Sequence, residues 1–511
     1  MSIEAPSRTS MPLVFLASIG LAVIFVALLN AVPMASNDLW LQLKVGQLIA
    51  DTHTIPRTLL FPFTAARDAT FNAHEWLASL LFHEASRVVG EGGLMLVQVA
   101  FGLAQFALCF LLARRLSRST GAALLLAMLA MLTVNFRYVL RPEVFALLFL
   151  VLLLDVLSRY RATGRRAVLL WTVPLGIAWA NCHGSFLLGP AIAGIFAVGE
   201  AASAAFARRA DATSPRLQRA WQAGWPYAAA ALAMLLACLV NPRGPELLAF
   251  AFQVQGSDAI KGLIKEWLPT FHPLFVVERG FWIFAVTSVL STGLLAVRWR
   301  DVTLTDLALF VAFAGLAMLR NRHIVWFAFV ALAVCASVLG RRDIPARVEE
   351  RLRIAVAALA LIGISLCVRF GNARYAFIYE SPSNNFTPPM AAELARPDLS
   401  GNVFNSYELG SELIYRDWPR LKPSIDSRVD SYGDGYFLAH ESLFLDEPRL
   451  LEFLENQRVG YMLLLRRDFD NNVRNMPHVA AAWHMRFADL KMALLERNVP
   501  LPAAAASASA R

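Results

Sequence analysis

The chain has 511 residues, of which 57% are hydrophobic and only 17% charged, and this balance excludes an ordinary soluble protein. Its formal net charge of +9 comes mostly from arginine. Because these arginines gather in short loops between long apolar runs, they indicate membrane orientation, and we expect no nucleic-acid partner. The five cysteines lie in or at the ends of apolar runs without metal-binding or disulfide spacing, so we interpret them as small buried residues.

Apolar runs of roughly 15–22 residues recur along the chain, and as helices they are long enough to cross a hydrocarbon core of about 30 Å. They predict an α-helical polytopic membrane protein with about eleven spans. No small-residue cleavage pattern follows the first run, so we expect a retained helix, with removal as a signal peptide as the alternative. The runs lie at about 11–32, 93–113, 120–136, 142–158, 167–182, 184–206, 226–241, 281–297, 303–319, 323–340 and 353–370.

Alternate connections between these runs differ in charge. One set consists of short loops rich in arginine, which places those loops, and the N-terminus with them, in the cytoplasm. An odd number of spans then puts the residues after about 370 outside. The arginine-rich loops are 114–118, 159–166, 208–219, 298–300 and 341–353.

The loops on the other side carry a mixture of cations, carboxylates, amides, His and Trp. Charged groups near a bilayer cost free energy unless they are paired, hydrated or needed for function. Several such loops at one membrane face therefore indicate a functional site. The alternative is that they anchor helices at the interface or form salt bridges within loops. The segments are Asn37-Asp38, Arg137 to Glu143, Asn181 to Gly184, Asn241 to Gly244, Lys265-Glu266-Trp267 and Arg320 to His323.

Residues 38–92 form the longest of these loops, and their apolar spacing predicts two interfacial helices, one near each end of the loop. The His74-Glu75 pair does not begin a zinc-binding HExxH motif, because Ala78 stands four positions after His74. Asp38 follows the first span directly, where a carboxylate can act as a general base or hold a divalent cation. The alternative is a helix-end residue that only forms hydrogen bonds.

Short motifs mark the outer loops and the C-terminal part. They are Asp38-Leu-Trp40 with Gly46, His74-Glu-Trp76-Leu77, Arg141-Pro142, Trp179-Ala-Asn181 with His183-Gly184, Asn241-Pro242, Glu266-Trp267, and Asp426-Ser-Arg428 with Tyr432-Gly433. With this layout the chain resembles the GT-C superfamily, polytopic glycosyltransferases that use polyprenyl-phosphate sugars, and more narrowly a bacterial family of polytopic membrane proteins. The two-acid DxD signature of some superfamily members is missing after Asp38, which leaves metal dependence open.

The resemblance implies a glycosyltransferase that moves a sugar from a polyprenyl-phosphate donor to a glycan, lipid or protein acceptor of the cell envelope, on the periplasmic side. Asp38 would be the general base, with inversion at the sugar carbon. The sequence names no cofactor and leaves a divalent cation, Mg²⁺ or Mn²⁺, open. Trp40 and Trp267 suit stacking on a sugar or anchoring at the interface.

Arginine presents planar donors that suit phosphate oxygens. We therefore expect the donor phosphate to be bound by Arg141, Arg243, Lys265, Arg320, Arg322 and His323. We expect the sugar and the acceptor to be bound by His74, Glu75, Asn181, His183, Glu266 and Trp267.

Hydropathy falls after about residue 370. Alternating short strands and helices predict a small periplasmic α/β domain at 371–500, after a transmembrane domain at 1–370, and residues 501–511 are predicted to be a disordered tail. The expected strands are 402–405, 422–426 and 459–465, the expected helices are 406–416 and 448–457, and segments that begin at Met485 and Met492 are expected to pair. The cluster Asp426, Arg428, Asp430 and Asp434 is interpreted as a structural salt-bridge knot, with contact to an acceptor or the membrane domain as the alternative.

Other functions fit parts of the pattern. A transporter or flippase of lipid-linked saccharides would place paired charges deep within interrupted helices, whereas here the charges lie mostly at the ends of apolar runs. A ligase or polymerase of lipid-linked glycans would use outer Arg and His without a carboxylate base. A non-catalytic envelope-assembly protein would need no site at all. No glycine-rich phosphate loop stands out, which disfavours a nucleotide-sugar enzyme.

Overall fold

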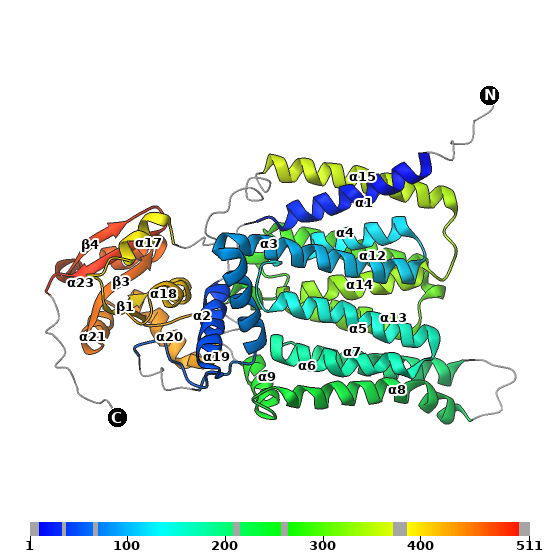
Figure 1. The fold of residues 1–511 in the computed structure, drawn as a ribbon, viewed down its shortest axis with the longest axis horizontal. Coiled ribbons are helices and arrows are strands. Elements are labelled where there is room, and N and C mark those ends of the chain that lie inside the picture. Colours follow the sequence, from blue (N-terminus) through cyan, green and yellow to red (C-terminus); the bar gives the residue numbers. More distant parts are fainter. Residues whose placement is uncertain are drawn as a thin grey trace. The chain divides into compact units, whose positions relative to one another are not determined.

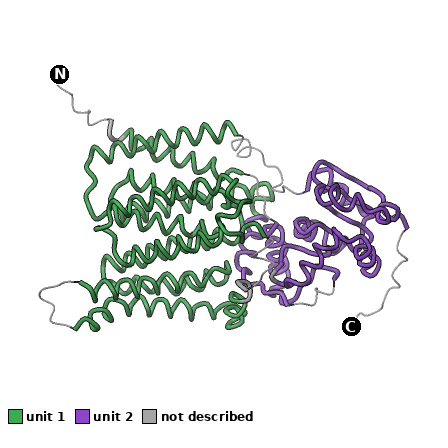
Figure 2. The backbone as a smooth tube through the Cα atoms, turned by 180° about the vertical axis from the view of Figure 1, so that it is seen from behind, with its two compact units in different colours: residues 1–33, 88–252, 261–381 green, residues 34–87, 253–260, 382–511 purple. Residues whose placement is uncertain are grey.

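The structure is a computed structural model that describes residues 10–32, 37–64, 70–207, 215–256, 264–370 and 386–499. The predicted tail, 501–511, lies outside these residues. The chain forms two compact units, which Figure 2 colours separately. Unit 1 comprises residues 1–33, 88–252 and 261–381, and unit 2 comprises residues 34–87, 253–260 and 382–511. The domain boundaries at 370 and 500 stay predictions.

Unit 1 is a helical bundle whose long helices run side by side (Figure 1). Its helices are α1 (Ser10–Asn30), most of α3 (Trp76–Ser117), α4 (Thr120–Val134), α5 (Glu143–Thr163), α6 (Thr172–Cys182), α7 (Leu188–Phe206), α8 (Arg216–Ala237), α9 (Glu246–Gly256), α11 (Pro273–Val276), α12 (Arg279–Val297), α13 (Leu304–Leu319), α14 (Ile324–Leu339) and α15 (Ala346–Arg369). Short 3-10 turns connect some of them: η2 (Arg166–Trp171), η3 (Cys238–Val240), η4 (Lys265–Trp267), η5 (Trp299–Asp301) and η6 (Asn321–His323). Every predicted apolar run overlaps one of these helices, and the runs at 167–182 and 226–241 also include the turns η2 and η3.

Seven helices among the described residues are long and apolar enough to cross a membrane. The prediction of an α-helical polytopic membrane protein is thereby confirmed, and the five cysteines are buried as expected. The number of spans stays a prediction, because α4, α6 and α13 have 15, 11 and 16 residues and α5 is charged near both ends.

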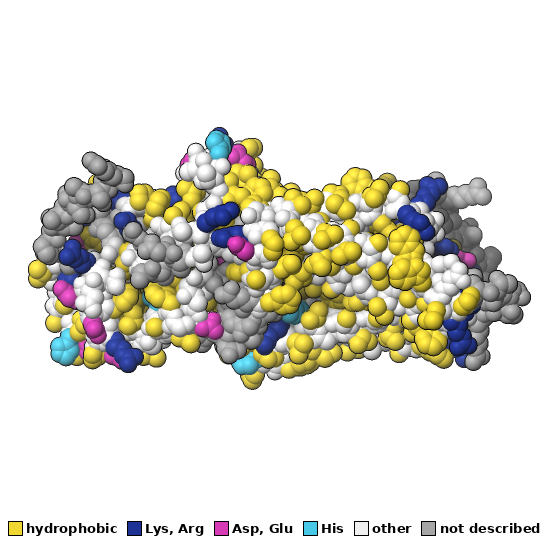
Figure 3. All heavy atoms as spheres, turned by 90° about the horizontal axis from the view of Figure 1, so that it is seen from below, with side chains coloured by type: hydrophobic (Ala, Val, Ile, Leu, Met, Phe, Trp, Pro, Cys, Tyr) yellow, Lys and Arg dark blue, Asp and Glu magenta, His cyan; other side chains and the backbone are white. Residues whose placement is uncertain are grey.

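The helix α14 forms the centre of unit 1. In its apolar window 78% of the residues are buried, against 17% for α15, which packs beside α1. The neighbours of α14 are α4, α5, α12 and α13. Hydrophobic side chains cover much of the visible face of the bundle, with Lys and Arg gathered at its end (Figure 3), as expected of a surface that faces lipid.

Local signals fix where several helices begin and end. A capping box starts α13, because the Thr303 hydroxyl accepts a hydrogen bond from the Asp306 N–H at 3.2 Å and the Asp306 carboxylate accepts one from the Thr303 N–H at 3.4 Å. Gly164, with a φ of 68°, ends α5 in the left-handed conformation that favours glycine. Gly90, with a φ of 72°, interrupts α3 near the end of the predicted loop at 38–92.

Unit 2 contains α2 (Asn37–Thr52), the first turns of α3, and a five-stranded mixed sheet of order β2-β1-β3-β5-β4. The strands are β1 (Gly401–Asn405), β2 (Leu421–Pro423), β3 (Val459–Leu465), β4 (Trp483–Ala488) and β5 (Met492–Arg497). β1 runs parallel to β2 and β3, whereas β5 runs antiparallel to β3 and β4. Its other helices are α17 (Pro388–Leu394), α18 (Gly410–Asp417), α19 (Val429–Tyr432), α20 (Asp434–Ser442), α21 (Glu447–Asn456), α22 (Arg466–Asn471) and α23 (Pro477–Ala482), with turns η7 (Tyr407–Leu409), η8 (Leu443–Leu445) and η9 (Val473–Asn475).

The small α/β domain is therefore confirmed, including the strand at 459–465 and the pairing of the segments that hold Met485 and Met492. Alternate residues of each strand point to opposite faces of the sheet. One hydrophobic core accordingly contains Phe404, Met462 and Leu464, and the other contains Val403, Tyr461 and Leu463.

The apolar side of α2 packs against α18. Trp40 is only 2% exposed, its ring centroid lies 5.1 Å from that of Tyr415, and the Arg416 guanidinium lies 4.9 Å from its ring. The expectation that Trp40 stacks on a sugar or anchors at the interface is wrong, because its ring belongs to the interior of unit 2. This packing fixes the orientation of α2 and of the Asp38 side chain that it carries.

Candidate functional site

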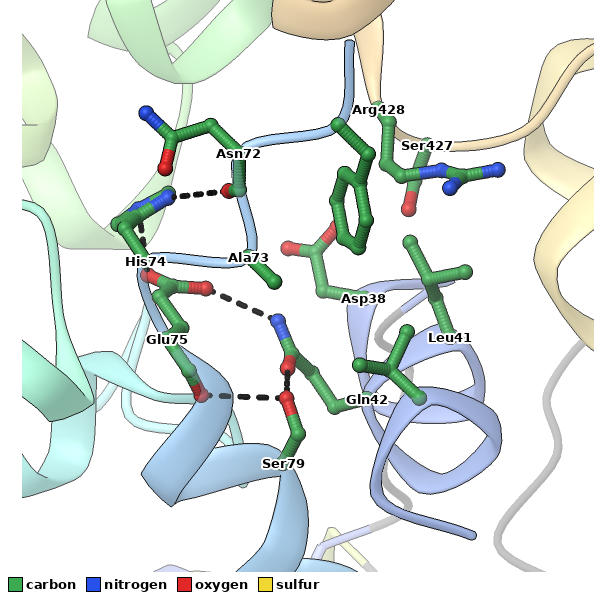
Figure 4. Close-up of a pocket in the computed structure, with 12 residues that line it drawn as sticks. Asp38, Leu41, Gln42, Asn72, Ala73, His74, Glu75, Ser79, Ser427 and Arg428 are labelled. Carbon is green, nitrogen blue, oxygen red and sulfur yellow. Dashed lines mark hydrogen bonds and ion pairs between the residues drawn. The ribbon is translucent and has the colours of Figure 1, made fainter. Parts of the chain in front are cut away.

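Unit 2 holds a pocket of about 180 Å³ that contains Asp38 (Figure 4). Asp38 and Gln42 reach it from α2, and His74 and Glu75 reach it from the turn before α3. In Figure 4 the Asp38 carboxylate points toward the loop that carries Asn72 and His74. The structure thus brings together three of the predicted site residues, Asp38, His74 and Glu75, although more than 30 positions separate the first from the other two.

The two helices beside this pocket touch through a glycine. A Cβ added at Gly46 of α2 would lie 2.1 Å from the backbone oxygen of Ser79 in α3, so only glycine allows this approach. The contact lets Gln42 donate a hydrogen bond to Glu75 at 2.9 Å and accept one from the Ser79 hydroxyl. These bonds hold the Glu75 carboxylate at the rim of the pocket.

His74 lies in the same turn. Its Nδ1 is 3.0 Å from the backbone oxygen of Asn72, and its Nε2 is 3.6 Å from the Glu75 carboxylate. No three His, Cys, Asp or Glu side chains gather closely enough among the described residues to form a metal site. The possibility of a cation at Asp38 therefore stays a prediction.

Arg428 joins the pocket from the C-terminal part of unit 2. Its guanidinium donates to both carboxylate oxygens of Asp426, at 2.8 and 2.5 Å, and lies 5.1 and 4.8 Å from the rings of Phe61 and Phe71. The Tyr432 hydroxyl donates to Asp426 at 2.8 Å, and burial beside that carboxylate raises the tyrosine pKa. For Asp426 and Arg428 the predicted salt-bridge knot is confirmed, and it ties the loop that ends at His74 to the α/β domain.

Unit 1 holds a second cluster, in which three arginines surround Glu266. Arg137 and Arg141 each donate to its Oε2, the latter at 3.2 Å, and Arg322 lies 3.6 Å from its Oε1. Arg137 also donates to Glu143 at 2.8 Å, and the side chains of this pair are 5% and 3% exposed. The Arg137–Glu143 pair is thus the buried base of the cluster.

The cluster carries one positive charge in excess, from three arginines and two carboxylates. Burial alone would raise the pKa of Glu266, but Arg137, Arg141 and Arg322 outweigh it and hold that pKa well below its usual range. Arg141 and Arg322 are each 18% exposed, and the buried Nε of Arg141 has no hydrogen-bond partner among the described residues. Because they are partly exposed, these two guanidinium groups are the ones in the cluster that can offer N–H donors to an anion.

The other predicted residues of unit 1 occupy neighbouring loops and not the cluster itself. Arg243 pairs with Glu246 at 3.3 Å, and the exposed Lys265 pairs with Glu278 at 2.6 Å. Asn241 donates to Asn181 at 3.3 Å, His183 Nδ1 lies 2.7 Å from the Ser185 hydroxyl, and His323 Nδ1 lies 3.1 Å from the Leu316 oxygen. Arg320 caps α13 and is partly exposed, and Trp267 lies beneath the guanidinium of Arg322.

Several residues that build these two arrangements are not among the predicted site residues. Arg137 and Glu143 stand in a loop that we recognised as polar, and their mixture of charges with Arg141 was the available signal. Gln42 and Ser79 carry no signal in the sequence, because a single polar residue on a helix is common. Their hydrogen bond depends on the close approach of α2 and α3 at Gly46.

No protein-family model and no curated protein matches the sequence. Solved structures match its fold at 13–14% identity. The archaeal oligosaccharyltransferase AglB from Archaeoglobus fulgidus, in complex with an inhibitory peptide and a dolichol-phosphate, matches with a TM-score of 0.57 at 13% identity, over 94% of this chain and 73% of that one. ArnT from Cupriavidus metallidurans, bound to undecaprenyl phosphate, matches with a TM-score of 0.54 at 14% identity, over 96% of this chain and 98% of that one.

A second structure of the A. fulgidus oligosaccharyltransferase, tethered to an acceptor peptide containing the NVT sequon, gives a TM-score of 0.55 at 13% identity, over 92% of this chain and 72% of that one. AglB and ArnT are both membrane glycosyltransferases of the GT-C superfamily that depend on polyprenyl phosphates. This chain therefore shares the fold of these solved structures.

Proposed function

We propose that the protein is a glycosyltransferase that moves a sugar from a polyprenyl-phosphate donor to an acceptor of the cell envelope. The fold supports this class, because structures that share it hold dolichol-phosphate, undecaprenyl phosphate or an acceptor peptide. The observation that carries the proposal is the position of Asp38, which lines a pocket together with Glu75 and His74. We place the reaction on the periplasmic side of a bacterial inner membrane, following the distribution of arginines among the loops.

The arginine cluster of unit 1 is proposed to bind the donor phosphate. A phosphate group accepts several hydrogen bonds from guanidinium groups in fixed geometry, and Arg141 and Arg322 have partly exposed donors. Glu266 keeps these cations together when no donor is bound. As the leaving phosphate gains negative charge during transfer, the excess positive charge of the cluster stabilises it.

Asp38 is proposed to act as the general base. Its carboxylate takes the proton of an acceptor hydroxyl or amine, whose oxygen or nitrogen attacks the anomeric carbon of the sugar. The bond between that carbon and the phosphate oxygen breaks, and the polyprenyl phosphate leaves with the bonding electrons. A single displacement of this kind inverts the anomeric carbon. Glu75 and His74 are proposed to hold acceptor or sugar hydroxyls at the same pocket.

Arg243, Lys265, Arg320 and His323 remain proposed phosphate contacts, and Asn181 and His183 remain proposed sugar contacts. Trp267 is proposed to act through Arg322, whose guanidinium lies over its ring. Their loops follow or precede spans of unit 1 at the end that holds the arginine cluster. Transfer requires one donor and one acceptor to reach both the cluster and Asp38.

Purified full-length protein should be incubated with a panel of radiolabelled polyprenyl-phosphate sugars and a crude envelope acceptor fraction. The proposal predicts binding of at least one donor and acceptor-dependent release of polyprenyl phosphate. A donor that is moved across a proteoliposome bilayer without release of its phosphate would contradict transfer and indicate a carrier. Absence of both binding and turnover across the panel would favour an assembly protein.

A further inference from the structure

A second cavity lies at the other end of the helices that carry the arginine cluster. The cluster stands where α4 ends and where α5 and α14 begin, because Arg137 follows α4, Glu143 starts α5 and Arg322 precedes α14. The cavity is lined by residues of the last turns of α3, α5 and α14 and the first turns of α13. Since α4 alone has 15 residues and an α-helix rises 1.5 Å per residue, about 22 Å of helix separates the two places.

This cavity of about 420 Å³ has a cationic rim and an apolar floor. The rim consists of Arg115, Arg118, Arg159, Arg161 and Arg341. The floor consists of Leu154 of α5, Phe196 of α7, Leu309 of α13, and Ala333 and Val334 of α14. A hydrophilic ligand would leave this floor in contact with water, so the cavity suits an amphiphile that has an anionic head.

Three carboxylates hold four of the rim arginines in place. Asp155 pairs with Arg115 at 2.7 Å and with Arg159 at 2.5 Å. Asp306 pairs with Arg161 at 3.1 Å and with Arg341 at 2.9 Å. The third carboxylate, Glu200, lies 2.8 Å from Arg161.

The fifth rim arginine, Arg118, is exposed and has no carboxylate partner among the described residues. Five arginines against three carboxylates leave two positive charges in excess. The φ of Arg118 is +57°, a conformation that L side chains rarely adopt and that turns the chain between α3 and α4. The four paired guanidinium groups thus lie beside Arg118, whose charge no carboxylate among the described residues neutralises. This arrangement suits a phosphate, which accepts charge-assisted hydrogen bonds from guanidinium groups.

We propose that this cavity binds the phosphate of an anionic phospholipid, with the start of an acyl chain on the apolar floor. Basic pockets between membrane helices attract anionic lipid headgroups, and arginine forks fit phosphate oxygens. This site is independent of the proposed transfer reaction. Loop arginines that only orient the helices need neither a cavity nor an apolar floor, so that alternative does not account for the arrangement.

Native mass spectrometry of the full chain in detergent tests the proposal. The probes are phosphatidylglycerol, phosphatidylcholine with the same acyl chains, polyprenyl phosphate and inorganic phosphate. We expect retention of phosphatidylglycerol over phosphatidylcholine. The double variant Arg118→Gln/Arg159→Gln should bind it about 25-fold more weakly, at about fivefold for each arginine removed. The control Arg347→Gln removes an exposed arginine at the same end that does not line the cavity, and should bind as the wild type does.

A second variant tests the floor without changing charge. Ser337 of α14 lines the cavity, and Ser337→Leu fills part of it, so phosphatidylglycerol should be lost while the thermal midpoint in lipid-free detergent stays within a few degrees. Polyprenyl phosphate retained in place of phosphatidylglycerol, and lost in both variants, would assign the site to that lipid phosphate instead. Equal binding of phosphatidylcholine, equal binding of inorganic phosphate alone, or unchanged binding in both variants would overturn the proposal.

Discussion

The guanidinium of Arg322 lies 4.3 Å from the ring centroid of Trp267, and one of its nitrogens lies 3.6 Å from the carboxylate of Glu266. Trp267 is 6% exposed, so its ring forms a floor for the arginine. Stacking on an aromatic face fixes the plane of a guanidinium and leaves its edge for hydrogen bonds. The tryptophan that we had assigned to a sugar thus already has a partner, and its proposed part in binding acts through Arg322.

Arg322→Lys should separate shape from charge at this position. Lysine keeps the positive charge but loses the planar fork and most of the stacking on Trp267, so the KM for the lipid-phosphate donor should rise about tenfold. The KM for the acceptor should stay the same. The matched control is Arg279→Gln, which removes an arginine that contacts Asn135 at the same end of unit 1. An unchanged donor KM in Arg322→Lys would argue against phosphate binding by this residue.

Glu266→Gln removes the carboxylate that holds three arginines together. We expect a loss of roughly 1–3 kcal/mol of unfolding free energy, less than the 3–5 kcal/mol typical of a fully buried pair, because Glu266 is 29% exposed. The variant should bind polyprenyl phosphate more tightly, since the bound phosphate no longer competes with a carboxylate. Thermal unfolding with and without the lipid measures both effects. A smaller ligand-induced shift than in the wild type would contradict the role of a counter-ion.

The same carboxylate should govern acid stability. Because the arginines lower the pKa of Glu266 in the folded protein, its contribution is present above the unfolded pKa of about 4.3 and is lost as the pH falls through the lowered folded pKa. Unfolding curves of wild type and Glu266→Gln should therefore differ by a constant amount from pH 5 to 9 and converge in more acidic buffer. A difference in unfolding free energy between the two proteins that grows as the pH falls would contradict a lowered pKa of Glu266.

Asp38→Asn should abolish transfer while leaving the fold intact. Asparagine is tolerated at the start of a helix as aspartate is, whereas loss of a general base lowers the rate by about 10²–10⁴-fold. The initial rate of sugar transfer and the thermal midpoint measure the two properties. Asp51→Asn is the control, because Asp51 is an exposed carboxylate near the other end of the same helix. Transfer at the wild-type rate in Asp38→Asn would remove Asp38 as the base.

Gly46→Ala should disturb the pocket without removing any of its polar side chains. The new Cβ would lie 2.1 Å from the Ser79 backbone oxygen and 2.7 Å from the His83 Cβ, so α2 must move away from α3. We expect at least the 1–3 kcal/mol that overpacking costs, faster proteolysis of unit 2 and reduced transfer. Gly20→Ala is the matched control in α1, where a Cβ meets no atom within 4 Å. Equal stability of the two variants would show that the close approach is unnecessary.

Much of the fold was predictable from the sequence, because membrane helices and buried strands are selected by hydrophobicity over many residues. The runs at 120–136 and 303–319 and the strand at 459–465 all coincide with elements of the structure. Trp40 was misassigned because a tryptophan after a span looks the same whether it faces lipid or, as here, packs under Tyr415. Burial against a partner far away in the chain leaves no local signal.

The sequence predicted which residues belong to the candidate site better than it predicted which of them contact one another. Asp38, His74 and Glu75 were selected and do line one pocket, and Arg141, Glu266 and Arg322 were selected and do meet. The sequence did not show that Glu266 would be enclosed by arginines, since that depends on three loops meeting. Nor did it show Arg137 as the base of the cluster, because an arginine at a span boundary is an ordinary orientation signal.

The central claim is that Asp38 and the arginine cluster serve one reaction, so both must face the same compartment. Single cysteines introduced as Asp51→Cys, Arg279→Cys and Arg347→Cys, after replacement of the five buried native cysteines, can be labelled on spheroplasts with a membrane-impermeant maleimide. We expect positions 51 and 279 to be labelled in intact spheroplasts and position 347 only after permeabilisation. Labelling of position 51 but not of position 279, or the reverse, would contradict it.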